Sequence, residues 1–229
     1  MLIGILQTGD LDPALEAAWG DYPAMFRKLL DGNGFSYRTW RVVDGVLPES
    51  PGDADAWLIT GSRHGAYEDH PWIAPLEAFI RACRDADAPM AGICFGHQIM
   101  AQALGGKVVK ADVGWGLGAQ GYKGSAGELR LLGFHQDQVV ELPAGAEVTA
   151  GSGFCPVAAL RYGDWGRSWQ GHPEFEAPFI RALGESKVGK GFTAEFVAAA
   201  MADAESAADG PKVGREIAAF FKARARAAA

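Results

Sequence analysis

The sequence predicts an α/β fold in three layers, with helices on both sides of a central, mostly parallel sheet to which antiparallel strands are added. Short apolar runs alternate with helical patterns in the first half, and the glycine-rich second half contains many short strand-like segments. A chain of 229 residues is long enough to bury a sizeable core. We expect residues 1–229 to form one domain, with a helical C-terminal extension from about residue 193.

The elements of the first half follow from periodicity and from turn residues. Strands are expected at 2–6, 35–43, 56–60 and 89–93, and helices at 22–30, 73–84 and 95–104. This alternation implies crossover units and parallel strand pairing. Segment 107–170 is expected to add further strands, some of them antiparallel, around 139–140, 147–149 and 158–160.

Two further groups of residues are given structural roles. Cys83 falls on the apolar face of the expected 73–84 helix and is interpreted as an inert core thiol. The alanine-rich tail is expected to be helical, and the basic residues near its end are interpreted as a solvated helix end: Lys222, Arg224 and Arg226.

The composition excludes several classes of protein. A formal net charge of -7 argues against binding to nucleic acid or anionic membranes, because no basic excess is present to neutralise phosphates. The three cysteines form no C-x-x-C pair and suit a reducing compartment. The N-terminus lacks the basic region of a secretory signal, and no apolar run approaches the roughly 18 to 20 residues that span a bilayer. A cytoplasmic location is therefore expected.

The strongest chemical signal is the G-x-C-x-G segment at residues 92–96, which lies between an expected strand and an expected helix. A residue on so tight a turn has a strained backbone, and side chains two positions away on either side would collide. The turn lifts the thiol above the carboxyl end of the sheet and places it at a helix N-terminus, which favours a thiolate. Cys94 is therefore a candidate nucleophile, although a buried thiol in a glycine-bounded turn gives the same pentapeptide.

A cysteine nucleophile needs a histidine within reach and a third group that orients this histidine. Pro173 forces His172 into an extended backbone. Residues two apart in such a segment share a face, so Glu174 can accept a proton from one ring nitrogen and leave the other free for the thiol. His172 and Glu174 are candidates for the base and the orienting group.

The other histidines have less specific surroundings. His97 is expected to pack or to form hydrogen bonds within the turn after Cys94. His64 and His70 are interpreted as residues of a surface loop. The role of His135 stays open at this point.

Together, GICFGHQ at residues 92–98 and QGHPEF at residues 170–175 resemble the class I glutamine amidotransferase family. The pattern of that family is G-x-C-x-G-x-Q followed by a distal G-H-P-E, and the similarity runs from residue 2 to about residue 179. The resemblance implies a flavodoxin-like fold and a hydrolase with Cys94 as nucleophile, His172 as base and Glu174 as orienting carboxylate.

The resemblance also implies the rest of the site. The backbone N–H groups of Phe95 and Ser62 would bind the oxyanion, although residues 60–63 read Thr-Gly-Ser-Arg where the family usually has two glycines and a proline. Four residues are implied to bind the substrate: Gly61, Gln98, Gly114 and Trp115. No metal or other cofactor is implied, and the Cys94–His97 segment lacks the further ligands of a zinc site.

The implied reaction is hydrolysis of the γ-amide of glutamine through a γ-glutamyl thioester, with release of ammonia. A synthetase subunit is a candidate partner, because the chain has no P-loop or other ATP-binding signature. One alternative is a γ-glutamyl peptidase acting on glutathione-like conjugates, and another is a non-catalytic regulatory subunit. Arg63 and His64 fit either a different leaving group or simple loop variation.

Overall fold

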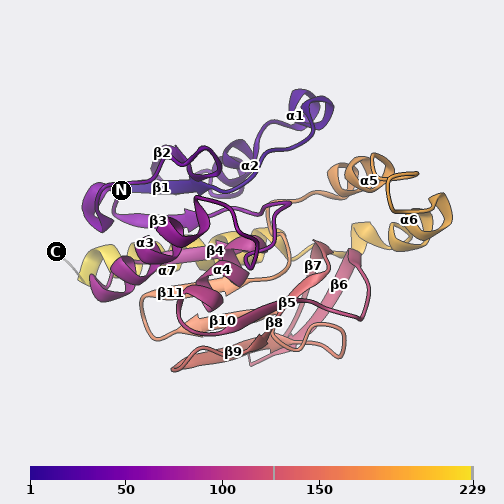
Figure 1. Cartoon of the computed structure of the whole chain (residues 1–229). Coiled ribbons are helices and arrows are strands. Elements are labelled where there is room, and N and C mark those ends of the chain that lie inside the picture. Colours follow the sequence, from indigo (N-terminus) through magenta and orange to yellow (C-terminus); the bar gives the residue numbers. More distant parts are fainter. Residues whose placement is uncertain (126, 228–229) are drawn as a thin grey trace.

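The computed structural model describes residues 1–125 and 127–227, and of residues 225–227 only the backbone. Within these residues a sheet of nine strands forms the centre (Figure 1). Its parallel half runs, in spatial order, through β2 (Ser36–Arg41), β1 (Leu2–Gln7), β3 (Ala56–Ile59), β4 (Met90–Ile93) and β11 (Gly166–Trp169). Its antiparallel half continues with β10 (Ala159–Tyr162), β9 (Ala146–Gly151), β6 (Gly116–Gly124) and β7 (Gly127–His135). A separate antiparallel pair consists of β5 (Lys107–Lys110) and β8 (Asp137–Glu141).

Helices cover both faces of the parallel half. Figure 1 shows α3 (Ile73–Asp85) and α4 (Phe95–Ala103) in front of the sheet and α7 (Gly210–Ala227) behind it. Successive strand residues point to opposite faces, so Leu58 packs with α7 and α2 (Tyr22–Leu29), while its neighbours Trp57 and Ile59 pack with α3 and α4. The result is a three-layer α/β fold.

A third apolar cluster lies beside the antiparallel half. It contains residues of α1 (Pro13–Trp19), α5 (Ala177–Glu185) and α6 (Ala194–Ala200). Short 3-10 helices lie at Val42–Asp44, Pro51–Asp53 and Ala204–Ser206. Among the described helices, none combines the length and apolar character that a membrane crossing requires.

The predicted fold class is confirmed, and each strand and helix expected in the first half is present to within two residues at its ends. Cys83 is fully buried, as expected for a core thiol. The sequence patterns did not reveal α1 or α5. Nor did they reveal that β11, which comes late in the chain, enters the sheet between β4 and β10.

The C-terminal helix α7 is packed into the core rather than attached loosely to it. It buries apolar residues against the strands: Val213, Ile217, Ala218 and Phe221. Lys222 donates a hydrogen bond to Asn33 Oδ1 at 2.8 Å, and Arg224 pairs with Asp87. The interpretation as a solvated helix end is therefore wrong for these two basic residues, and the side chain of Arg226 lies outside the described part of the chain.

The corner between β4 and α4 is closed sterically. Cys94 occupies it with φ 53° and ψ -103°, a backbone conformation that L-residues rarely adopt. A Cβ on Gly92 would lie 2.5 Å from the Gly96 carbonyl oxygen, and a Cβ on Gly96 would lie 2.5 Å from that of Ile59. The expected need for glycine on both sides of the cysteine is confirmed, because backbone atoms cannot move aside as the end of a side chain can.

We predict that Gly92→Ala lowers the free energy of unfolding by about 1–3 kcal/mol, the usual cost of forcing an extra carbon into a packed site. Urea denaturation followed by circular dichroism measures this change. Gly121→Ala is the matched control, since a Cβ there meets no atom within 4 Å. Equal midpoints for Gly92→Ala and the unsubstituted chain would show that the corner tolerates a side chain.

Candidate active site

Cys94 lies where β4 ends and α4 begins, and it is 5% exposed. Its backbone N–H donates to the carbonyl of Trp169 in β11 at 2.8 Å, which ties the corner to the neighbouring strand. The N–H of Phe95, the first residue of α4, makes no hydrogen bond within the described chain, as expected for a helix N-terminus. The corner therefore presents a thiol beside a free backbone donor.

His172 lies just beyond β11 and is held from two sides. Its backbone N–H donates to the carbonyl of Leu132 in β7 at 2.8 Å. Its ring stacks on Phe175 with a centroid distance of 3.9 Å and an angle of 3°. Its Nδ1 atom lies 2.7 Å from Glu174 Oε1, and both side chains are buried. The pairing expected from the His-Pro-Glu spacing is thus present as a contact.

The His172 ring and the Cys94 side chain both lie against Gly61. A Cβ on Gly61 would lie 2.9 Å from Cε1 of His172 and 3.8 Å from Cβ of Cys94, so no side chain fits there. Burial lowers the pKa of His172, but the Glu174 carboxylate and the Cys94 side chain outweigh it and raise this pKa to about 10. Both neighbours therefore favour the protonated form of the imidazole, which can donate its proton.

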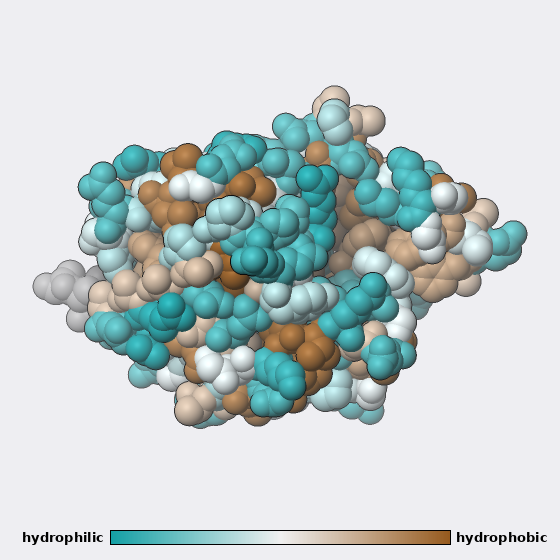
Figure 2. Space-filling view, in the orientation of Figure 1, coloured by the Kyte–Doolittle hydropathy of each residue, from teal (hydrophilic) through white to brown (hydrophobic). Residues whose placement is uncertain are grey.

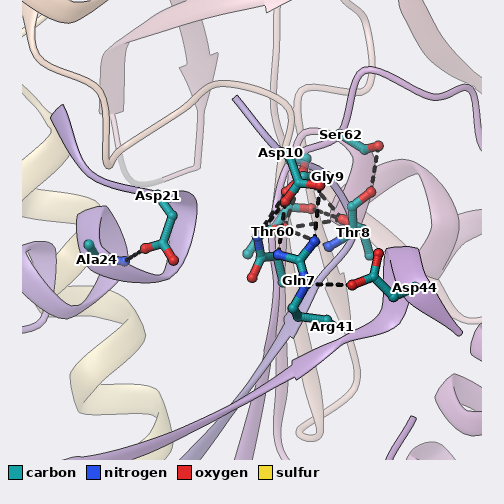
Figure 3. A network of polar contacts seen from close by, with 11 residues as sticks. Gln7, Thr8, Gly9, Asp10, Asp21, Ala24, Arg41, Asp44, Thr60 and Ser62 are labelled. Atoms are coloured by element: carbon teal, nitrogen blue, oxygen red, sulfur yellow. Dashed lines mark hydrogen bonds and ion pairs between the residues drawn. The ribbon is translucent and has the colours of Figure 1, made fainter. Parts of the chain in front are cut away.

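The loop after β3 is fixed by a threonine of the first strand-to-helix connection (Figure 3). The hydroxyl of Thr8 contacts the carbonyl oxygens of Thr60 at 3.0 Å and Gly61 at 3.2 Å. Ser62 Oγ in turn donates to the carbonyl of Thr8 at 2.7 Å and accepts from the N–H of His64 at 3.1 Å. The Ser62 N–H has no acceptor among the described residues, so it is available to a ligand.

Ion pairs extend this network away from the thiol. Arg41 pairs with Asp10 at 3.0 Å and with Asp44 at 2.5 Å, and Gln7 Nε2 donates to Asp10 at 2.9 Å (Figure 3). These contacts join the ends of β1 and β2 to the connection that carries Thr8. Thr8 was not identified from the sequence, because its role depends on the neighbouring strand β3.

Gln170 is a second residue that the sequence did not single out. It is completely buried, its Nε2 lies 3.6 Å from Cys94 Sγ, and its Oε1 accepts from Gln98 Nε2 at 3.1 Å. Gln98 also donates to the carbonyl of Asp137 at 2.9 Å. The only signal in the sequence was the position of Gln170 two residues before His172, on the same side of an extended segment.

A cavity of about 380 Å³ opens in front of Cys94. Figure 2 shows a hollow with a hydrophilic rim between the body of the molecule and the lobe of α5 and α6. The cavity is lined by three of the expected residues besides Cys94, namely Ser62, Gln98 and Trp115. Gly114 is not among the lining residues, and Gly61 faces the thiol and the imidazole instead.

Two other histidines are neutral and buried. His97 contacts Ser168 Oγ through Nδ1 at 2.8 Å and the Val157 carbonyl through Nε2 at 3.1 Å. The expected hydrogen bonding is present, but its partners lie in β11 and before β10 rather than within the turn after Cys94. Burial lowers its pKa to about 3. His135 lines the cavity and contacts the carbonyl of Asp137 at 3.3 Å, and burial lowers its pKa to about 4. Neither ring is a proton acceptor comparable to His172.

Known proteins resemble this chain over most of its length. The chain is 34% identical over 178 residues to gamma-glutamyl peptidase 4 of Arabidopsis thaliana, and the match covers 71% of each of the two chains. It is 32% identical over 154 residues to a glutamine-hydrolyzing GMP synthase component of Halobacterium salinarum, covering 58% of this chain and 73% of that protein. The crystal structure of a glutamine amidotransferase from Methylobacillus flagellatus matches with a TM-score of 0.80 and 21% identity, covering 97% of this chain and 94% of the other.

The structural match extends over nearly the whole chain and supports the α/β architecture. The family model described as "Glutamine amidotransferase class-I" matches residues 53–178, a range that includes the corner at Cys94 and the His172–Glu174 pair. The chain therefore belongs to the class I glutamine amidotransferase family.

Proposed function

We propose that this chain hydrolyses γ-glutamyl amide bonds, with Cys94 as nucleophile, His172 as proton carrier and Glu174 as orienting carboxylate. The observation that carries the proposal is that the Cys94 side chain and the His172 ring both lie against Gly61, while Glu174 Oε1 lies 2.7 Å from Nδ1 of that ring. A thiolate next to an imidazolium is a strong nucleophile beside a ready proton donor.

In the first half of the reaction, Cys94 Sγ attacks the side-chain carbonyl of the γ-glutamyl group. A C–S bond forms, and the electron pair of the C=O π bond moves to the oxygen. The backbone N–H groups of Phe95 and Ser62 stabilise this oxyanion, and each such donor contributes on the order of 10² to 10³ in rate. When the intermediate collapses, the C–N bond breaks and His172 gives its proton to the departing nitrogen.

In the second half, the imidazole of His172 takes a proton from water, which attacks the γ-glutamyl thioester. The C–S bond breaks, and glutamate leaves with the thiolate restored. Glu174 holds the tautomer of His172 throughout, and the stacked ring of Phe175 fixes its plane. Gln170 Nε2, 3.6 Å from the sulfur, adds a weak donor to the thiolate.

The charges around the cavity favour γ-glutamyl peptides as substrates over glutamine. Its lining includes more basic than acidic side chains: Arg63, Lys110, Lys187 and Lys190, against Glu68 and Asp137. The leaving group of a peptide such as glutathione carries its own carboxylate, which these cations attract. The leaving group of glutamine is uncharged ammonia. The peptidases of Arabidopsis thaliana among the relatives support the same substrate class.

Glutamine is the second candidate substrate, supported by the GMP synthase relatives. The ammonia released would then be passed to a partner synthetase subunit. Incubating the protein with glutamine and with glutathione in parallel, and following free glutamate, separates the two candidates. Release from glutamine alone would overturn the preference for peptides.

We predict that Cys94→Ala abolishes glutamate release and that Glu174→Gln lowers kcat by about 10² to 10⁴, because the imidazole loses the group that fixes its tautomer. Glu176→Gln is the matched control, since that carboxylate is exposed and pairs with Lys28.

A glutamine-mimicking electrophile should label Cys94, and peptide mass spectrometry should find the buried Cys83 and Cys155 unmodified. Hydrolysis that survives Cys94→Ala would remove the proposed nucleophile.

We predict that Ser62→Ala lowers kcat by about tenfold with little change in KM. The substitution keeps the backbone N–H but removes the hydroxyl that ties it to Thr8, so the donor is less well fixed in the transition state. Steady-state kinetics measures the split between kcat and KM, and Ser206→Ala, on a 3-10 helix that contributes nothing to the cavity lining, is the control. An unchanged kcat would count against Ser62 as an oxyanion donor.

We predict that the double substitution Lys110→Gln and Lys190→Gln lowers kcat/KM for glutathione about tenfold, or about 1.4 kcal/mol for two exposed charges. For glutamine the change should be about twofold or less, because its leaving group is uncharged. Lys123→Gln, on β6 and outside the cavity lining, is the control. Equal losses for both substrates would place these lysines at the shared γ-glutamyl part and contradict the proposed leaving-group contact.

A further inference from the structure

Three potential metal ligands lie together in the loop between β3 and α3. His64, Glu68 and His70 each offer one ligand atom, and these three atoms lie within 4.8 Å of one another. His70 Nε2 is 2.7 Å and His64 Nδ1 is 3.5 Å from the same oxygen, Glu68 Oε2. No step of the proposed reaction uses any of these side chains.

The donor set and its spacing suit a zinc-type ion. Zinc binds imidazole nitrogen and carboxylate oxygen at about 2.0–2.2 Å in tetrahedral sites, so neighbouring ligand atoms are about 3.3 Å apart. The distances of 2.7 and 3.5 Å to Glu68 Oε2 bracket that value. Small side-chain rotations would bring three donors to one ion, with a fourth position open. Two histidines and one carboxylate are a common ligand set of such open zinc sites.

Neighbouring contacts hold the ligands in place. The Glu68 N–H donates to the Gly65 carbonyl at 3.1 Å, which closes a turn between the first two ligands. The His64 N–H is held by Ser62 Oγ at 3.1 Å. The ring of His70 stacks on Trp72, with 5.7 Å between the ring centroids and 6° between the ring planes, and Trp72 is itself buried. The ligands are therefore partly ordered by the fold, which lowers the entropic cost of binding a metal ion.

We propose that His64, Glu68 and His70 bind one zinc-type divalent ion at the rim of the catalytic cavity. His64 and Glu68 both line that cavity, while His64 and His70 line the groove next to it.

The test is a Zn²⁺ titration of the full chain carrying Cys94→Ser. This substitution removes the thiol of Cys94, which would otherwise compete for zinc. Isothermal titration calorimetry should show one ion per chain. Glu68→Gln and His70→Gln should each weaken binding at least tenfold, since even outer partners of metal ligands contribute 10- to 100-fold. Asp69→Asn is the matched control, a neighbouring carboxylate outside the cluster, and should bind Zn²⁺ like the parent.

A second readout is the visible absorption of Co²⁺, which replaces zinc in tetrahedral sites and should give an intense spectrum that Glu68→Gln abolishes. Circular dichroism establishes that each variant is folded. Absence of stoichiometric binding to the parent, or equal affinity in Glu68→Gln, His70→Gln and Asp69→Asn, would overturn the proposal. Neither readout requires hydrolytic activity, so the metal site is tested independently of the proposed reaction.

Discussion

At the corner between β4 and α4 the backbone of Cys94 takes φ 53°, a Cβ on Gly92 would collide with the carbonyl of Gly96, and a Cβ on Gly96 would collide with the carbonyl of Ile59. This close approach forces the chain from strand to helix within one residue, and it fixes the thiol at the carboxyl end of the parallel strands. A free helix N-terminal N–H lies next to it. The other parts of the site are arranged around this one strained residue.

The strand order of the sheet brings His172 to the corner that carries Cys94. Because β11 pairs with β4, the segment after β11 leaves the sheet beside the corner, and it carries both Gln170 and His172. The antiparallel strand β7 then receives the His172 backbone through Leu132. The antiparallel half of the sheet is thus more than an addition to a parallel core, since it holds the imidazole in position and lines the cavity through His135 and its neighbours.

Charge is distributed unevenly between the whole chain and the cavity. The chain has a formal net charge of -7, yet basic side chains predominate among the charged residues that line the cavity. Field lines concentrate in such a hollow, so its local potential follows the lining residues more closely than the net charge of the chain. Two members of the proposed metal site, His64 and Glu68, lie in the lining of the same cavity.

The sequence by itself determined the parallel elements, the glycine-bounded corner at Cys94 and the pairing of His172 with Glu174, because each depends on neighbours a few residues apart. It also carried the family resemblance in two short motifs. The contacts of Thr8 and Gln170 and the packing of α7 were decided only by the tertiary structure. Strand order, turn geometry and side-chain packing bring these groups together, and no local periodicity encodes such contacts.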